Sequence, residues 1–121
     1  MSDNFTYEQP RRMSRRELEA AFQSGDGEKI GTALIAATYT ENGAWILDWC
    51  VKFVDHQDGV ARYSVALTLS AMSFMEESES SLVKCREIAE RLCNDPDESV
   101  RVAARDALED VLQASKSDGA S

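Results

Sequence analysis

The stretch that decides the fold is Asn94-Asp95-Pro96-Asp97-Glu98-Ser99-Val100-Arg101-Val102-Ala103-Ala104-Arg105-Asp106-Ala107-Leu108. Its first residues predict a capped helix start, and the small apolar residues after them follow the spacing of a helix packing face. A fainter copy, from Asp55 to Leu69, lies 39 residues upstream, where Asp58 corresponds to Asp97 and Arg62 to Arg101. Repetition at this period is typical of stacked pairs of helices.

Helical patterns continue on both sides of this stretch. Ser14-Arg15-Arg16-Glu17 is a capping box that predicts a first helix ending near Gly25. The other expected helices cover residues 26–38, 44–54, 58–74, 82–93 and 95–112, the last of them with Asp95 as its cap and Glu98 completing a capping box. We expect a flexible arm over residues 1–13, a helical domain over 14–112 and a disordered tail over 113–121. The fold class predicted is all-α, a short α-solenoid of about three antiparallel helical hairpins.

The residues Asp95-Pro96-Asp97, followed by Val100-Arg101, Ala103-Ala104 and Ala107-Leu108, resemble the second helix of a HEAT or HEAT-like (armadillo-type) repeat. The resemblance is good over residues 80–112, fair over 44–74 and weak over 14–40. It implies a right-handed stack of helical hairpins whose second helices line one concave face. It also implies that Arg62 and Arg101 pair with acids of a neighbouring turn, which is a structural role.

Charge is the most distinctive property of the composition. The chain has 121 residues, which suffices for one core, and a formal net charge of −9. Four of the 13 basic residues are arginines between positions 11 and 16, so the rest of the chain sets 22 acids against nine bases. Such a surface repels phosphate backbones and attracts basic proteins, so we expect a basic protein partner and no direct binding of nucleic acid. The alternative is that the acidity only maintains solubility.

The sequence offers no set of residues for catalysis or for a cofactor. His56 is the single histidine, and Cys50 lies in an apolar stretch that predicts an unreactive thiol. Cys85 and Cys93 lack the spacing of a metal site, and no glycine-rich phosphate loop is present. We therefore expect no enzymatic activity, no cofactor and no metal. The odd number of cysteines, with no apolar membrane span or signal peptide, favours a cytoplasmic protein.

The candidate binding residues are polar side chains of the second helices that lie off the packing stripe. They are Asp58, Tyr63, Glu98, Asp106, Glu109 and Asp110. If the second helices share one face, these side chains form a carboxylate-rich groove with an aromatic anchor. That composition suits a protein surface rich in lysine and arginine.

These features favour a protein-binding module without chemistry of its own. The specific hypothesis is a bacterial immunity or inhibitor protein that binds and neutralises a basic toxin or nuclease, because small size, acidity and a rigid scaffold suit the blocking of a cationic active site. One alternative is a scaffold or adaptor subunit of a complex, whose acidity serves solubility. A second, which the resemblance suggests, is a relative of the HEAT-like bilin lyases.

Overall fold

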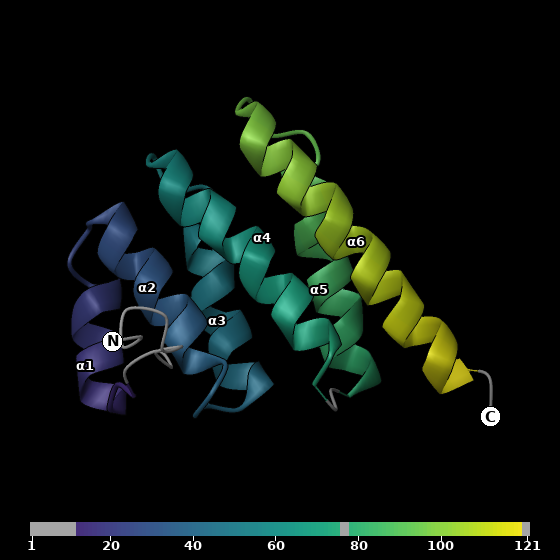
Figure 1. The fold of residues 1–121 in the computed structure, drawn as a ribbon, viewed down its shortest axis with the longest axis horizontal. Coiled ribbons are helices and arrows are strands. Elements are labelled where there is room, and N and C mark those ends of the chain that lie inside the picture. The colour runs from purple at the N-terminus through teal and green to yellow at the C-terminus, as the bar shows by residue number, and fades with distance from the viewer. Residues whose placement is uncertain (1–11, 76–77, 120–121) are drawn as a thin grey trace, which may run out of the picture.

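The computed structural model describes residues 12–75 and 78–119, and all the regular secondary structure in these residues is helical (Figure 1). The helices are α1 (Arg15–Phe22), α2 (Gly27–Ala37), α3 (Gly43–Phe53), α4 (Gly59–Ser73), α5 (Glu79–Leu92) and α6 (Glu98–Gly119). Successive helices pack antiparallel, so the all-α class predicted from the sequence is confirmed. The arm expected at the N-terminus lies outside the described residues as far as residue 11.

Side-chain caps fix where the helices begin. Ser14 and Glu17 form the predicted capping box: Ser14 Oγ accepts from the Glu17 N–H at 3.1 Å, and Glu17 Oε1 accepts from the Ser14 N–H at 2.9 Å. The caps of α2, α3, α4 and α5 are Asp26, Asn42, Asp58 and Ser78. Because Ser78 caps α5, this helix begins before Leu82, the start expected from the sequence.

Both ends of α6 differ from the prediction. The helix begins at Glu98, and the Arg101 N–H donates to the Asp97 carbonyl at 3.1 Å, so Asp97 holds the place expected for Asp95. At the other end α6 does not stop near Leu112 but continues to Gly119, so residues 113–119 are helical where a disordered tail was expected. Ala114 continues the packing face beyond Leu112, which explains the extra turns.

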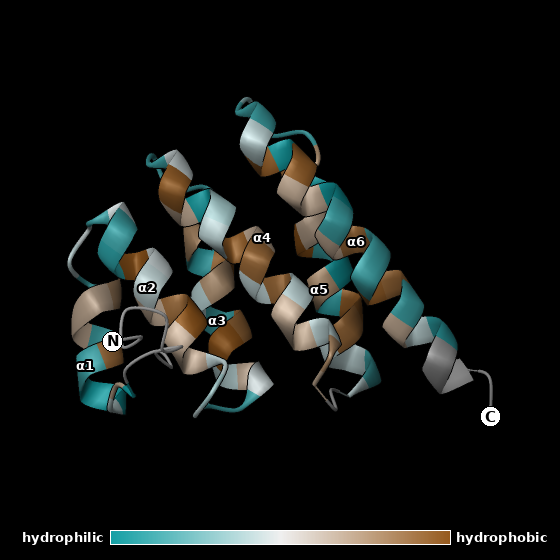
Figure 2. Ribbon diagram, in the orientation of Figure 1, coloured by the Kyte–Doolittle hydropathy of each residue, from teal (hydrophilic) through white to brown (hydrophobic). Residues whose placement is uncertain are grey.

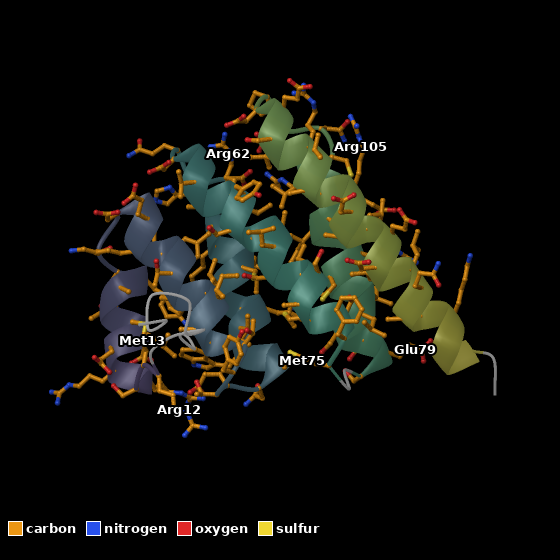
Figure 3. All side chains as sticks on the ribbon, viewed as in Figure 1. Arg12, Met13, Arg62, Met75, Glu79 and Arg105 are labelled. Atoms are coloured by element: carbon orange, nitrogen blue, oxygen red, sulfur yellow. The ribbon has the colours of Figure 1, made fainter. Side chains whose placement is uncertain are left out.

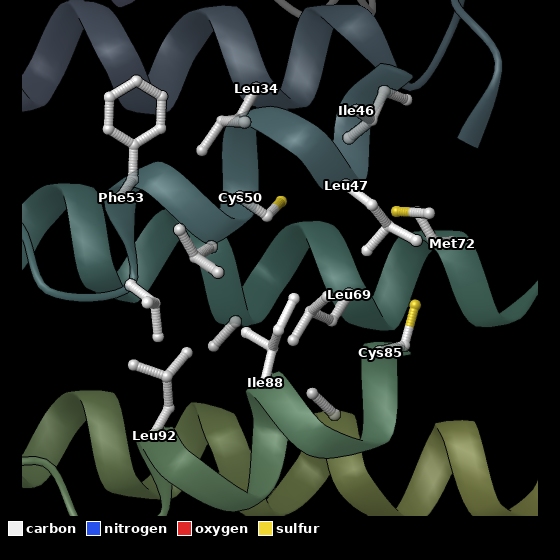
Figure 4. Close-up of a cluster of buried hydrophobic side chains, with 14 of the residues drawn as sticks. Leu34, Ile46, Leu47, Cys50, Phe53, Leu69, Met72, Cys85, Ile88 and Leu92 are labelled. Atoms are coloured by element: carbon white, nitrogen blue, oxygen red, sulfur yellow. The ribbon is translucent and has the colours of Figure 1, made fainter. Parts of the chain in front are cut away.

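The helices form two layers (Figure 1). Helices α2, α4 and α6 lie side by side in one layer, α3 and α5 lie behind them, and α1 lies at the edge beside α2. Side chains from both layers fill the core between them, among them Leu34, Leu69 and Met72 from one layer and Ile46 and Cys85 from the other (Figure 4). Alanines on α4 and α6 are buried at the contact of these two helices, so their backbones approach closely.

An aromatic cluster closes the side where α1 meets α3. Phe22 lies 4.6 Å from Trp49 and 5.6 Å from Phe53, measured between ring centroids, and Trp45 lies beside them. The Arg15 guanidinium carbon sits 4.6 Å from the centroid of the Trp45 ring. The side chains of Trp45 and Trp49 are therefore half-buried and pack against the hydrophobic core.

Candidate functional site

The turns that lead into α2, α4 and α6 each contain the same type of hydrogen bond. In each turn an aspartate comes directly before the helix, and its backbone N–H donates to the side chain two residues earlier. These bonds join Asp26 N to Ser24 Oγ at 3.1 Å, Asp58 N to His56 Nδ1 at 3.0 Å, and Asp97 N to Asp95 Oδ1 at 2.9 Å. His56, the single histidine, therefore has a structural partner in the turn before α4.

A buried ion pair joins the start of α4 to the turn before α6. Arg62 Nε donates to Asp95 Oδ2 at 2.7 Å and Arg62 Nη2 donates to Asp95 Oδ1 at 3.2 Å, although the two residues are 33 positions apart. Their side chains are only 14% and 5% exposed. The hydrogen bond to Asp95 raises the pKa of Arg62, and the charges of Asp95, Asp97 and Asp58 add to the shift, while desolvation opposes it.

The two arginines aligned in the sequence make equivalent backbone contacts. Arg62 Nη1 donates to the His56 carbonyl at 2.6 Å, and Arg101 Nη1 donates to the Asp95 carbonyl at 2.8 Å. Figure 3 shows Arg62 near the first turn of α4. The structural role that the resemblance implies is confirmed for Arg62, which pairs with an acid of the neighbouring turn. This pairing also explains why Asp95 does not cap α6.

A groove of about 600 Å³ runs between α4 and α6, in the layer that also contains α2. It is lined by Tyr63, Leu67, Ser70, Glu98, Ser99, Val102, Ala103, Asp106 and Asp110. The structure thus brings together four of the residues selected from the sequence, namely Tyr63, Glu98, Asp106 and Asp110. Figure 2 shows hydrophobic stretches of α4 beside a largely hydrophilic α6.

The other two selected residues do not line this groove. Asp58 caps α4, with its Oδ1 accepting from the Val60 N–H at 2.9 Å. The same carboxyl group lies against Gly27, where there is no room for a side chain. Glu109 is exposed on α6 outside the groove lining. Asp58 is thus a structural residue of the turn, and the acidic wall consists of Glu98, Asp106 and Asp110.

Sequence reasoning missed the apolar part of the groove. Leu67 and Val102 are 39% and 47% exposed, and together with Tyr63 they give the groove a contiguous apolar surface. The signal was present in the spacing, because Leu67 follows Tyr63 by one helical turn and Asp106 follows Val102 by one turn. Both side chains are aliphatic, however, and the sequence pattern does not distinguish an exposed aliphatic residue of a groove from one of the packing face.

A second groove, of about 740 Å³, lies between α2 and α4. Its described lining is mostly small or apolar: Met13, Glu28, Gly31, Thr32, Ile35, Ala36, Val60 and Ser64. Only Glu28 carries a charge among these residues. The two grooves therefore differ in character although both border α4.

The thiols have the surroundings of core residues. Cys50 and Cys85 are fully buried, and Cys93 is partly exposed. Burial, with a smaller contribution from Cys85, raises the pKa of the Cys50 thiol, which keeps it protonated at neutral pH. Among the side chains described in residues 12–75 and 78–116, no group of three or more His, Cys, Asp or Glu is arranged to hold a metal ion.

Comparison with known proteins assigns no family to the chain, because no family model, curated protein or solved structure matches it. Among the helices that the structure describes, none combines the length and apolar character needed to cross a bilayer.

Proposed function

We propose that this chain is a short HEAT-like α-solenoid of three helical hairpins, α1 with α2, α3 with α4 and α5 with α6. The shared turn hydrogen bond before α2, α4 and α6 supports this proposal, since an equivalent contact recurs at each second helix. The close approaches of Asp58 to Gly27 and of Asp97 to Gly59 support it as well, because each second helix then meets the next one in the same way.

We further propose that the domain binds a basic protein through the groove between α4 and α6. The observation that carries this function is the joint lining of one groove by three carboxylates and three exposed apolar side chains, with no basic residue among the described residues that line it. The acids steer a cationic partner to the groove, and the apolar side chains supply the area that holds it. Neutralisation of a basic toxin or nuclease is the role that best suits a small acidic domain of this kind.

The test uses two variants with equal changes of charge. Asp106→Lys/Asp110→Lys reverses the acidic wall of the groove, and Glu87→Lys/Glu90→Lys reverses two exposed acids of α5. The partner is recovered from the native cell extract with the tagged full chain, and its association rate is measured against salt concentration. We expect the wild-type rate to fall with salt, and the groove variant to lose about tenfold or more in rate while the α5 variant changes little. A neutral partner, or equal losses in both variants, contradicts the proposal.

A scaffold or adaptor role is the second candidate, and the groove between α2 and α4 favours it. That groove is larger and nearly uncharged, so a second protein could occupy it while the acidic groove is filled. Val60→Asp introduces a charge there. If a captured partner is lost in this variant and retained in the α6 charge reversal, the adaptor function is supported over the neutralising one.

A further inference from the structure

The groove between α4 and α6 has two unlike walls. Helix α4 contributes Tyr63 and Leu67, which are 38% and 39% exposed, and no charged side chain. Helix α6 contributes the acids Glu98, Asp106 and Asp110 beside Val102. A segment that fits both walls must carry an apolar face next to a basic stripe.

Phe74 extends the apolar wall beyond the groove. It is the C-cap of α4, lies in helical backbone conformation and is 80% exposed. Because it follows Tyr63 by eleven residues, about three helical turns, it points to nearly the same side of α4. The apolar wall is therefore about 16 Å long at 1.5 Å per residue, which matches about three turns of a bound helix.

Electrostatic repulsion of a basic segment is weak along this path. No lysine or arginine lines the groove among the described residues. Arg105, which is exposed on α6, lies on the side of that helix away from α4 (Figure 3). Along α6, Asp106 follows Glu98 by about two helical turns and Asp110 follows Asp106 by about one, so the acids are spread along the length of the groove.

The hydrogen-bonding groups in the groove decide between an extended and a helical occupant. An extended segment presents backbone N–H and C=O groups that need partners when water is excluded. Only the hydroxyls of Tyr63 and Ser70 could donate to its carbonyl groups, because the described residues of the groove lining include no asparagine or glutamine and the Ser99 hydroxyl already donates to Asp97 Oδ1 at 3.1 Å. A helix satisfies its own backbone and needs none of them.

We infer that the groove binds one amphipathic helix of the basic partner, about three turns long. Its apolar face packs on Tyr63, Leu67 and Val102, and its lysine and arginine stripe faces the acids of α6. This inference rests on the function proposed above and adds the form of the segment that is recognised.

The test uses synthetic peptides and the full chain. The first peptide has leucines on one helical face with lysines beside them, the second has the same composition in a scrambled order, and the third carries a proline in the middle of the first sequence. Fluorescence anisotropy measures each Kd. We expect the first peptide to bind about tenfold or more tighter than either of the others, because only a helix places all its leucines on the apolar wall. Similar affinities for all three, or no binding at all, would overturn the inference.

Two valine variants connect that result to the groove. Val102→Asp places a charge on the α6 wall of the groove, and Val83→Asp places one on α5, where Val83 is exposed to a similar degree, 40%. The first should abolish the preference for the amphipathic peptide and the second should preserve it, with equal helical circular dichroism in both. The charge reversal at Asp106 and Asp110 separates the two proposals. If this charge reversal still lowers the association rate of the natural partner while the three peptides bind with similar affinity, the proposal of a bound helix is wrong and the proposed binding of a basic partner is retained.

Discussion

Asp95→Ala tests whether the ion pair with Arg62 holds the turn before α6 in place. The substitution removes both oxygens that accept from Arg62, at 2.7 and 3.2 Å, and the acceptor of the Asp97 N–H at 2.9 Å. Arg62 then keeps one bond, to the His56 carbonyl at 2.6 Å. The guanidinium thus loses its hydrogen-bonded counter-charge, and only the charges of Asp97 and Asp58 still act on it, in a site where its side chain is only 14% exposed.

The expected loss follows from these contacts. Removing one member of a buried pair costs about 3–5 kcal/mol. Since the edge of the Arg62 side chain reaches water and one hydrogen bond survives, we take about 2–4 kcal/mol for this part. The lost turn bond adds about 1 kcal/mol, so the free energy of unfolding should fall by about 3–5 kcal/mol. In Asp95→Asn the amide oxygen still accepts in the turn, and the loss should be about 2 kcal/mol.

The matched control is Asp55→Ala. Asp55 binds Arg91 Nη2 at 2.6 and 2.7 Å, but the side chains of Arg91 and Asp55 are 62% and 66% exposed. Exposed pairs contribute about 0–1 kcal/mol, so this variant should unfold almost as the wild type does. Urea denaturation followed by circular dichroism gives each value. Equal losses in the two alanine variants, or a loss below about 1 kcal/mol for Asp95→Ala, would show that burial of the pair is not what matters.

Two shorter predictions concern the contacts between neighbouring helices and the buried thiols. Gly27→Ala should destabilise the fold by about 1–3 kcal/mol, because the added Cβ would collide with the carboxyl group and the Cβ of Asp58. Gly59→Ala should cost less, because its Cβ would collide only with a terminal oxygen of Asp97. The midpoints of urea unfolding compare the two variants. In the native protein at pH 8, iodoacetamide should label Cys93 well before Cys50, because Cys50 is buried and burial raises the pKa of its thiol. Mass spectrometry after a timed quench measures the order of labelling, and labelling of Cys50 first would contradict this.

The helices could be predicted because their signals are local. Ser14 with Glu17, and Asp26, mark their helix starts through contacts within a few residues, and the structure confirms both. The start of α6 could not be predicted, since Asp95 and Asp97 both match a cap and the choice depends on Arg62, 33 residues from Asp95. A local sequence pattern contains no information about a contact with a residue so far away in the chain.

The candidate groove was predictable in its charge and not in its shape. Tyr63, Glu98, Asp106 and Asp110 could be selected because polar side chains off a packing stripe are expected to face outward. Asp58 fits the same description, yet its carboxyl group caps α4 and lies against Gly27. Which acids form a wall of the groove depends on how one helix packs against the next, and this packing cannot be predicted from the sequence of either helix alone.

The same contacts that hold α4 to α6 also set the width of the groove. Arg62 directs its side chain to Asp95 in the turn before α6, and the next residue, Tyr63, lines the groove. On α6, Arg101 binds the Asp95 carbonyl, and the next residue, Val102, lines the opposite wall. Asp95 therefore connects both walls through adjacent residues. Because a loosened pair would move Tyr63 relative to Val102, we expect the buried ion pair to keep the groove rigid as well as to stabilise the fold.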